Sequence, residues 1–129
     1  MKLSLLFADC EVASVDHADS GVSIRLSAAH VEQAATSQTE KPLSGFSRGV
    51  NLFLEGATLH EATALFGRVS AGRVQLAGQW KSSIPLPLLH VGPVTLELAF
   101  ANQSQLTVSA HGLQCRFNGD ANFAESYFC

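Results

Sequence analysis

Apolar and polar residues alternate along two consecutive stretches in the last third of the chain. In the first stretch, 94–100, every second residue is apolar, and after the polar segment 102–105 the alternation resumes over 106–110. A period of two places all the apolar side chains on one face and all the polar ones on the other. Two such runs joined by a short Asn- and Ser-containing segment predict an antiparallel hairpin with one buried face. Because an isolated hairpin is not stable in water, other segments must supply the opposing layer.

Similar patterns predict further strands elsewhere. Alternation marks 22–28 and 50–54, and the segment 2–7 is a further strand candidate. The residues Val74, Leu76, Gly78 and Trp80 share one parity, so we expect Trp80 in the core. Segment 84–88 contains two prolines, which remove two backbone donors and therefore predict an extended edge segment or a polyproline conformation.

Other segments carry weaker signals. The echo of Gly67-Arg68-Val69 in Gly72-Arg73-Val74 predicts two strands that meet at a turn over 70–72. Segment 32–47 is polar and lacks periodicity, which predicts a surface loop that is a candidate lid. Segment 59–66 fits a short helix or a strand, and so does 120–128.

These segments add up to seven to nine short strands with closely spaced turn signals. This pattern predicts an all-β fold: an antiparallel β-sandwich or jelly roll, or a partly open barrel, with at most one or two short helices. At 129 residues, without a break in composition, the chain is expected to form one domain spanning 1–129.

Composition narrows the classes of partner. The net charge is −3, so the chain lacks the positive field that attracts nucleic acids, and no apolar run approaches the roughly 20 residues of a membrane span. The N-terminal MKLSLLFADC has too short an apolar run for a signal peptide, and Asp9 precedes the cysteine where a small uncharged residue belongs. Three cysteines without a CxxC pair fit reduced thiols. We therefore expect a cytoplasmic protein without nucleic-acid or membrane partners.

The charged fraction also bears on assembly. Only 15% of the residues are charged, against about 25% in an ordinary soluble domain, and hydrophobic residues make up 47%. Low charge on a small domain indicates that another chain covers part of its surface. An exposed apolar edge is a common interface, so we expect a homodimer formed through Ile84, Leu86 and Leu88.

Five histidines are spread along the chain, and four of them form a candidate metal site: His30, His60, His90 and His111. A cupin-like enzyme or sensor would need two or three of these to converge around one metal ion. No two histidines are closer than thirteen positions, and His60-Glu61 lacks the second histidine of an HExxH motif. We therefore expect no cofactor, and the metal site remains an alternative.

The segment Gly45-Phe46-Ser47-Arg48-Gly49 spells the GxSxG motif of a nucleophile elbow. That elbow works only between a strand and a helix, whereas the sequence after Gly49 is strand-like. We therefore expect a protein that acts by binding or assembly rather than an enzyme. A module that holds a small apolar ligand between its sheets is a further alternative.

Overall fold

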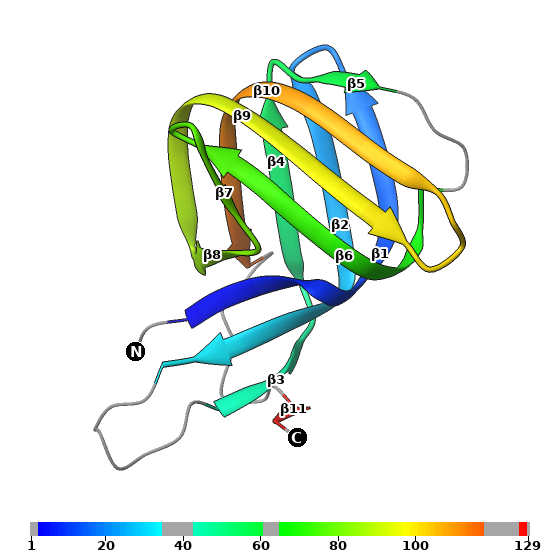
Figure 1. Cartoon of the computed structure of the whole chain (residues 1–129), viewed down its shortest axis with the longest axis vertical. Helices are drawn as coiled ribbons and strands as arrows, with labels where there is room; N and C mark the ends of the chain where they lie inside the picture. The colour runs from blue at the N-terminus through cyan, green and yellow to red at the C-terminus, as the bar shows by residue number, and fades with distance from the viewer. Residues whose placement is uncertain (1–2, 35–42, 61–64, 118–126, 129) are drawn as a thin grey trace.

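The computed structural model describes residues 3–34, 43–60, 65–117 and 127–128. These residues form eleven β-strands and contain no helix (Figure 1). The strands are β1 (Leu3–Ala18), β2 (Gly21–Gln33), β3 (Leu43–Ser47), β4 (Val50–Glu55), β5 (Thr58–His60), β6 (Gly67–Leu76), β7 (Gln79–Lys81), β8 (Ser83–Leu86), β9 (Leu88–Phe100), β10 (Gln105–Phe117) and β11 (Tyr127–Phe128).

Six of the strands form a closed ring. Strand β2 pairs with β4, followed in order by β10, β9, β6 and β1, and β1 pairs again with β2 (Figure 1). All of these pairings are antiparallel. The predicted all-β, antiparallel fold is therefore confirmed. The finer expectation of a sandwich, jelly roll or partly open barrel is not, because the strands make one sheet that closes on itself.

The barrel interior is filled by the apolar residues that the alternation identifies. The predicted hairpin is present as β9 and β10, and its alternate residues from Val94 to Ala110 point inward. In a six-stranded barrel the inward side chains fill the interior, and burial of each large aliphatic side chain contributes roughly 1.5–3 kcal/mol. The largest fully buried side chains come from β1, β2, β4, β8, β9 and β10: Leu5, Ile24, Leu52, Leu54, Ile84, Leu96, Leu106 and Leu113.

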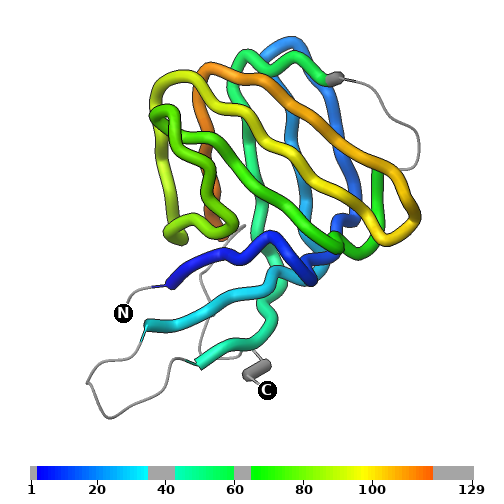
Figure 2. Tube along the Cα trace, in the orientation of Figure 1, coloured from blue at the N-terminus to red at the C-terminus, as the bar shows by residue number. Residues whose placement is uncertain are grey.

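Part of the sheet extends beyond the ring. The first half of β1 and the last part of β2 leave the barrel together, and β3 pairs with this part of β2 (Figure 2). The expectation of a loop over 32–47 is therefore wrong for Leu43–Ser47, which pairs with Ala29–Gln33. Leu43–Ser47 forms a strand because its backbone pairs with β2, although its sequence lacks apolar periodicity. Residues 35–42 lie outside the described part of the chain.

A large bulge in β1 separates its two halves. Leu6 pairs with His30 and Glu11 pairs with Ala28, so four residues of β1 face a single residue of β2. Asp9, inside this bulge, has a φ of 71°. Bulges bend a strand and increase its twist. The second half of β1 then closes the ring against β6 through the pairs Glu11–Arg68 and Val12–Gly67.

The two Gly-Arg-Val segments belong to one strand, so the predicted turn at 70–72 is wrong. β6 runs through both segments with a register shift between Val69 and Ala71. A Cβ atom on Gly72 would lie 2.6 Å from Cβ of Phe7 and 2.7 Å from Cδ2 of Leu98. Gly72 thus leaves room for two side chains that pack over the strand, and does not make a turn.

The expectation that Trp80 is buried is also wrong. Trp80 lies in the short strand β7 and is 41% exposed. The guanidinium of Arg73 lies 4.0 Å from the centre of its ring, a cation–π contact on the outer surface. The turn residues Ala77 and Gly78, both with positive φ, separate Trp80 from the inward-facing residues of β6.

The two segments left open between helix and strand lie partly outside the described residues. In 59–66, Leu59 and His60 belong to β5, and residues 61–64 are not described. In 120–128, only Tyr127 and Phe128 are described, and they pair with Phe46 and Gly45 of β3.

Candidate functional site

Of the expected interface residues, Ile84 and Leu86 lie on β8, and Leu88 begins β9. Ile84 is 1% exposed and Leu86 4%, so both belong to the core, and Leu88 is half-buried. Pro85 and Pro87 are exposed between and beyond them. β8 pairs with Leu3–Leu6 of β1 and with no other described strand, so it is an edge strand as the prolines predict. Its apolar side chains nevertheless face inward and cannot form an exposed patch.

The exposed apolar residues of this region lie one strand further along the chain. Leu89 is 69% exposed and Val91 is 86% exposed, which are the two highest values among the large hydrophobic residues that the structure describes. Both belong to β9 and point to the outer face, opposite Gln114 and Gly112 of β10. The sequence did not single them out because Leu88, Leu89 and Val91 are apolar at both parities, so alternation could not assign their faces.

The backbone of β9 is also free on one side in this region. β9 pairs with β10 along most of its length, but its pairing with β6 covers only Val94–Phe100. No described strand pairs with the other side of the segment from Leu88 to Gly92. An unpaired strand edge can accept another strand. Pro87 and Pro93 flank this segment, and neither has an N–H group to donate.

The candidate metal ligands lie on four different strands: His30 on β2, His60 on β5, His90 on β9 and His111 on β10. His30 stacks on Phe46, with 5.3 Å between ring centres. The side chain of His60 is not among those described. Within the described residues, no group of three or more His, Cys, Asp or Glu side chains could hold a metal ion.

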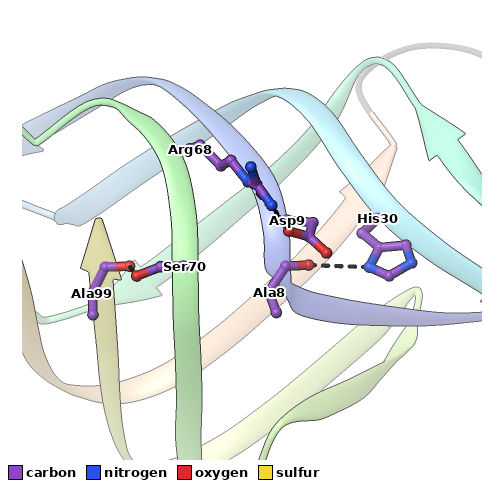
Figure 3. A network of polar contacts seen from close by, with 6 residues as sticks. All are labelled: Ala8, Asp9, His30, Arg68, Ser70 and Ala99. Carbon is purple, nitrogen blue, oxygen red and sulfur yellow. Dashed lines mark hydrogen bonds and ion pairs between the residues drawn. The ribbon is translucent and has the colours of Figure 1, made fainter. Parts of the chain in front are cut away.

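His30 instead takes part in a network at the β1 bulge. Its Nδ1 lies 3.0 Å from the carbonyl oxygen of Ala8, and Arg68 reaches Asp9 from the neighbouring strand β6 (Figure 3). The backbone N–H of His30 donates to Sγ of Cys10, whose thiol donates to the carbonyl of Leu6 at 3.0 Å. These contacts hold the extra residues of the bulge between β2 and β6.

Two of the three cysteines are described, and both are free and buried. Burial raises the pKa of the Cys10 thiol to about 11, a shift that the bond from His30 opposes and the charge of Asp9 reinforces. Burial likewise raises the pKa of Cys115 to about 12. A nucleophilic cysteine needs a lowered pKa, so these thiols are structural.

Ser47 of the GxSxG segment is also structural. It is 6% exposed, and its hydroxyl donates to the carbonyl of Arg48 at 3.3 Å. It ends β3 just before the turn into β4, and β4 then pairs with β2, as β3 does. A connection between two strands lacks the helix that a nucleophile elbow requires, so the motif is coincidental.

Comparison of the chain with protein-family models, with curated proteins and with solved structures finds no match. Among the described residues no helix is long and apolar enough to cross a membrane. The candidate functional site is therefore defined by the geometry of this chain alone: the free edge of β9 over residues 88–92, which we call the β9 edge.

Proposed function

We propose that the protein acts by binding rather than by catalysis, and that it assembles as a homodimer through the β9 edge. The observation that carries this proposal is the coincidence of a free backbone edge with two highly exposed apolar side chains, Leu89 and Val91. Addition of a strand to such an edge gains main-chain hydrogen bonds and covers the apolar side chains at once. The low charged fraction of 15% is consistent with a covered surface.

The flanking prolines select one register for the dimer. A two-fold interface uses the same patch on both copies. If two β9 edges pair antiparallel around His90, Leu89 of each copy faces Val91 of the other, and all four prolines stay outside the paired segment. A register moved by two residues would bring a proline into the pairing and lose a donor. Because only five residues pair, the interface is small, and we expect a weak dimer with a Kd of roughly tens of micromolar.

Sedimentation velocity between about 5 and 300 µM tests the proposal, with the range chosen to span that affinity. The wild-type protein is expected to shift from monomer to dimer as concentration rises. The variant Val91→Asp is expected to remain monomeric, because each copy would place a carboxylate against the apolar partner residue. Leu43→Asp is the matched control, since Leu43 is 53% exposed and lies on β3 away from the β9 edge.

Either of two results would reject the β9 edge as the interface. One is a wild-type protein that stays monomeric at the highest concentration. The other is a dimer that Leu43→Asp disrupts and Val91→Asp leaves intact. Circular dichroism of each variant shows that the fold is retained, which is expected because neither side chain is buried.

A further inference from the structure

A second surface feature lies outside the β9 edge, on the outer face of β2, β4 and β10. The register aligns outward-facing residues of these strands into rows that cross the sheet. One row contains Arg25, Asn51 and Arg116, because Asn51 of β4 pairs with Arg25 on one side and with Arg116 on the other. The next row contains Ser23, Phe53 and Gln114. A cavity of about 600 Å³ lies over these rows, and it is lined by both arginines, Asn51 and Phe53 among others.

The two arginines of this cavity have no partner within the described part of the chain. The ion pairs among the described residues join Arg68 to Asp9 and Arg73 to Glu97, and both lie outside this cavity. Neither Arg25 nor Arg116 makes a hydrogen bond or an ion pair with another described residue. Arg25 and Arg116 are exposed. Neighbouring strands are about 4.8 Å apart, so the two Cα atoms lie about 10 Å from each other across Asn51, within reach of two long side chains that converge on one ligand.

The side chain between them carries an unsatisfied polar atom. Oδ1 of Asn51 is buried and has no hydrogen-bond partner among the described residues. A buried polar atom without a partner costs free energy that a ligand or a water molecule recovers. Rotation of the amide exchanges its oxygen and nitrogen, so Asn51 can place its NH2 group at this position and donate to an anion.

We propose that this cavity binds a phosphate monoester, with the phosphate between Arg25 and Arg116 and the organic part against Phe53. A phosphate presents three terminal oxygens and so accepts from two guanidinium groups at once, whereas a single guanidinium already satisfies a carboxylate. Phe53 lies two residues along β4 from Asn51, about 7 Å away, on the same outer face. It therefore offers an apolar surface beside the anion.

Two carboxylates also line the cavity, and their positions limit where the anion sits. Glu55 lies four residues from Asn51 on the same strand, about 13 Å away, which exceeds the Debye length of about 10 Å at 0.1 M salt. Asp16 pairs with Ser23 and is thus closer to Arg25 than to Arg116. The arginine row is therefore the most positive part of the cavity lining, Asp16 offsets part of its charge from the side of Arg25, and removal of Asp16 is expected to tighten anion binding.

The test uses the isotope-labelled protein in about 0.1 M salt, where the Debye length is about 10 Å, titrated with phenyl phosphate and followed by amide and arginine Nε–H resonances. We expect saturable shifts confined to β2, β4 and β10 around the cavity. Arg25→Gln and Arg116→Gln should each raise the Kd about tenfold, which corresponds to about 1.4 kcal/mol. Arg48→Gln removes the same charge from an exposed position outside the cavity and should change the Kd less than twofold. Asp16→Asn should lower the Kd.

The outcomes decide between a site and general charge attraction. The absence of saturable shifts with phenyl phosphate at 10 mM, in a folded wild-type protein, would overturn the proposal. So would an effect of Arg48→Gln as large as that of Arg25→Gln and Arg116→Gln. Benzoate and inorganic phosphate should bind more weakly than phenyl phosphate, since each lacks one of the two recognised groups. Equal binding of inorganic phosphate would remove the role assigned to Phe53. The site needs no second copy of the chain, so a monomeric protein tests it equally well.

Discussion

Asp9 and Arg68, which are 59 residues apart in the sequence, form an ion pair across the seam that closes the barrel. One carboxylate oxygen of Asp9 accepts from Nη2 of Arg68 at 2.6 Å and from Nε at 3.2 Å. The pair lies next to the short β1–β6 pairing, where only Glu11–Arg68 and Val12–Gly67 align. The β1–β6 contact, which has the fewest backbone pairs in the ring, is thus also held by an ion pair between side chains.

The backbone of Asp9 should matter more for stability than its charge. Both partners are largely exposed, at 68% and 45%, so loss of the ion pair is expected to cost less than about 1 kcal/mol. The φ of 71° is tolerated by Asp and Asn but is costly for a β-branched residue. In urea unfolding, Asp9→Asn and Arg68→Gln should therefore lower the free energy of unfolding slightly, and Asp9→Val by about 1–2 kcal/mol more. Equal losses for Asp9→Val and Asp9→Asn would show that the bulge is not held in this conformation.

Gly72 should resist even the smallest substitution. The Cβ atom of Gly72→Ala would approach Cβ of Phe7 to 2.6 Å, and Phe7 cannot swing that atom away because it is fixed to the backbone. Overpacking of this kind typically costs about 1–3 kcal/mol. Thermal and urea unfolding should show that loss for Gly72→Ala, whereas Ala71→Ser at the exposed neighbouring position should stay within about 0.5 kcal/mol. A neutral Gly72→Ala would mean that β1 does not pack over β6 at this point.

Truncation to alanine should destabilise the protein at Ile84 but not at Leu89. Ile84 is 1% exposed, so Ile84→Ala should lower the free energy of unfolding by about 2–5 kcal/mol. Leu89 is 69% exposed, and Leu89→Ala in the monomer should change it by less than about 0.5 kcal/mol. Urea unfolding at low protein concentration measures both. If Ile84→Ala left the free energy of unfolding unchanged, Ile84 would have to be exposed, and it would again be a candidate interface residue.

The strand content of this chain could be predicted from the sequence because alternation reports burial directly. Val94–Phe100 and Leu106–Ala110 are buried at every second residue, as the pattern requires. Alternation does not report which strands are neighbours, so closure of β1 on β6 could not be foreseen. It also fails where both parities are apolar. For Leu88–Val91 the sequence does not show which side chains point outward. In Ile84–Leu86 the prolines identified an edge strand, but the sequence did not show that the side chains of Ile84 and Leu86 point inward.

The candidate sites depend on relationships that only the register supplies. Arg25, Asn51 and Arg116 are 26 and 65 positions apart, and nothing in their local sequences links them. They meet because β4 pairs with β2 on one side and with β10 on the other. Gly72 shows the same limit. The segment Ser70-Ala71-Gly72 predicts a turn from local preference, whereas a glycine is needed there because Phe7, 65 positions away, packs against it.

Because burial raises the pKa values of its cysteine thiols, the protein is expected to lose stability in alkaline solution. In the unfolded chain a cysteine titrates near 9.0, whereas burial raises the pKa of Cys115 to about 12 in the folded protein. Between these values the unfolded state has lost its proton and the folded state has kept it. The unfolded state therefore binds fewer protons, and the free energy of unfolding falls as pH rises. The contribution of this thiol is fully present below pH 9 and declines by about 1.4 kcal/mol per pH unit above it.

Urea unfolding at pH 8.5, 9.5 and 10.5 isolates this effect when the wild-type protein is compared with Cys115→Ala. The substitution lowers stability by a fixed amount at all three values because it removes buried volume, so only the slopes are informative. The wild-type slope should be steeper by about 1.4 kcal/mol per pH unit between 9.5 and 10.5. Other groups that titrate in this range, Cys10 included, remain in both proteins and cancel in the comparison, apart from the charge interaction between the two thiols. Parallel slopes would mean that solvent reaches Cys115 in the folded state, and that the barrel interior is open at this strand.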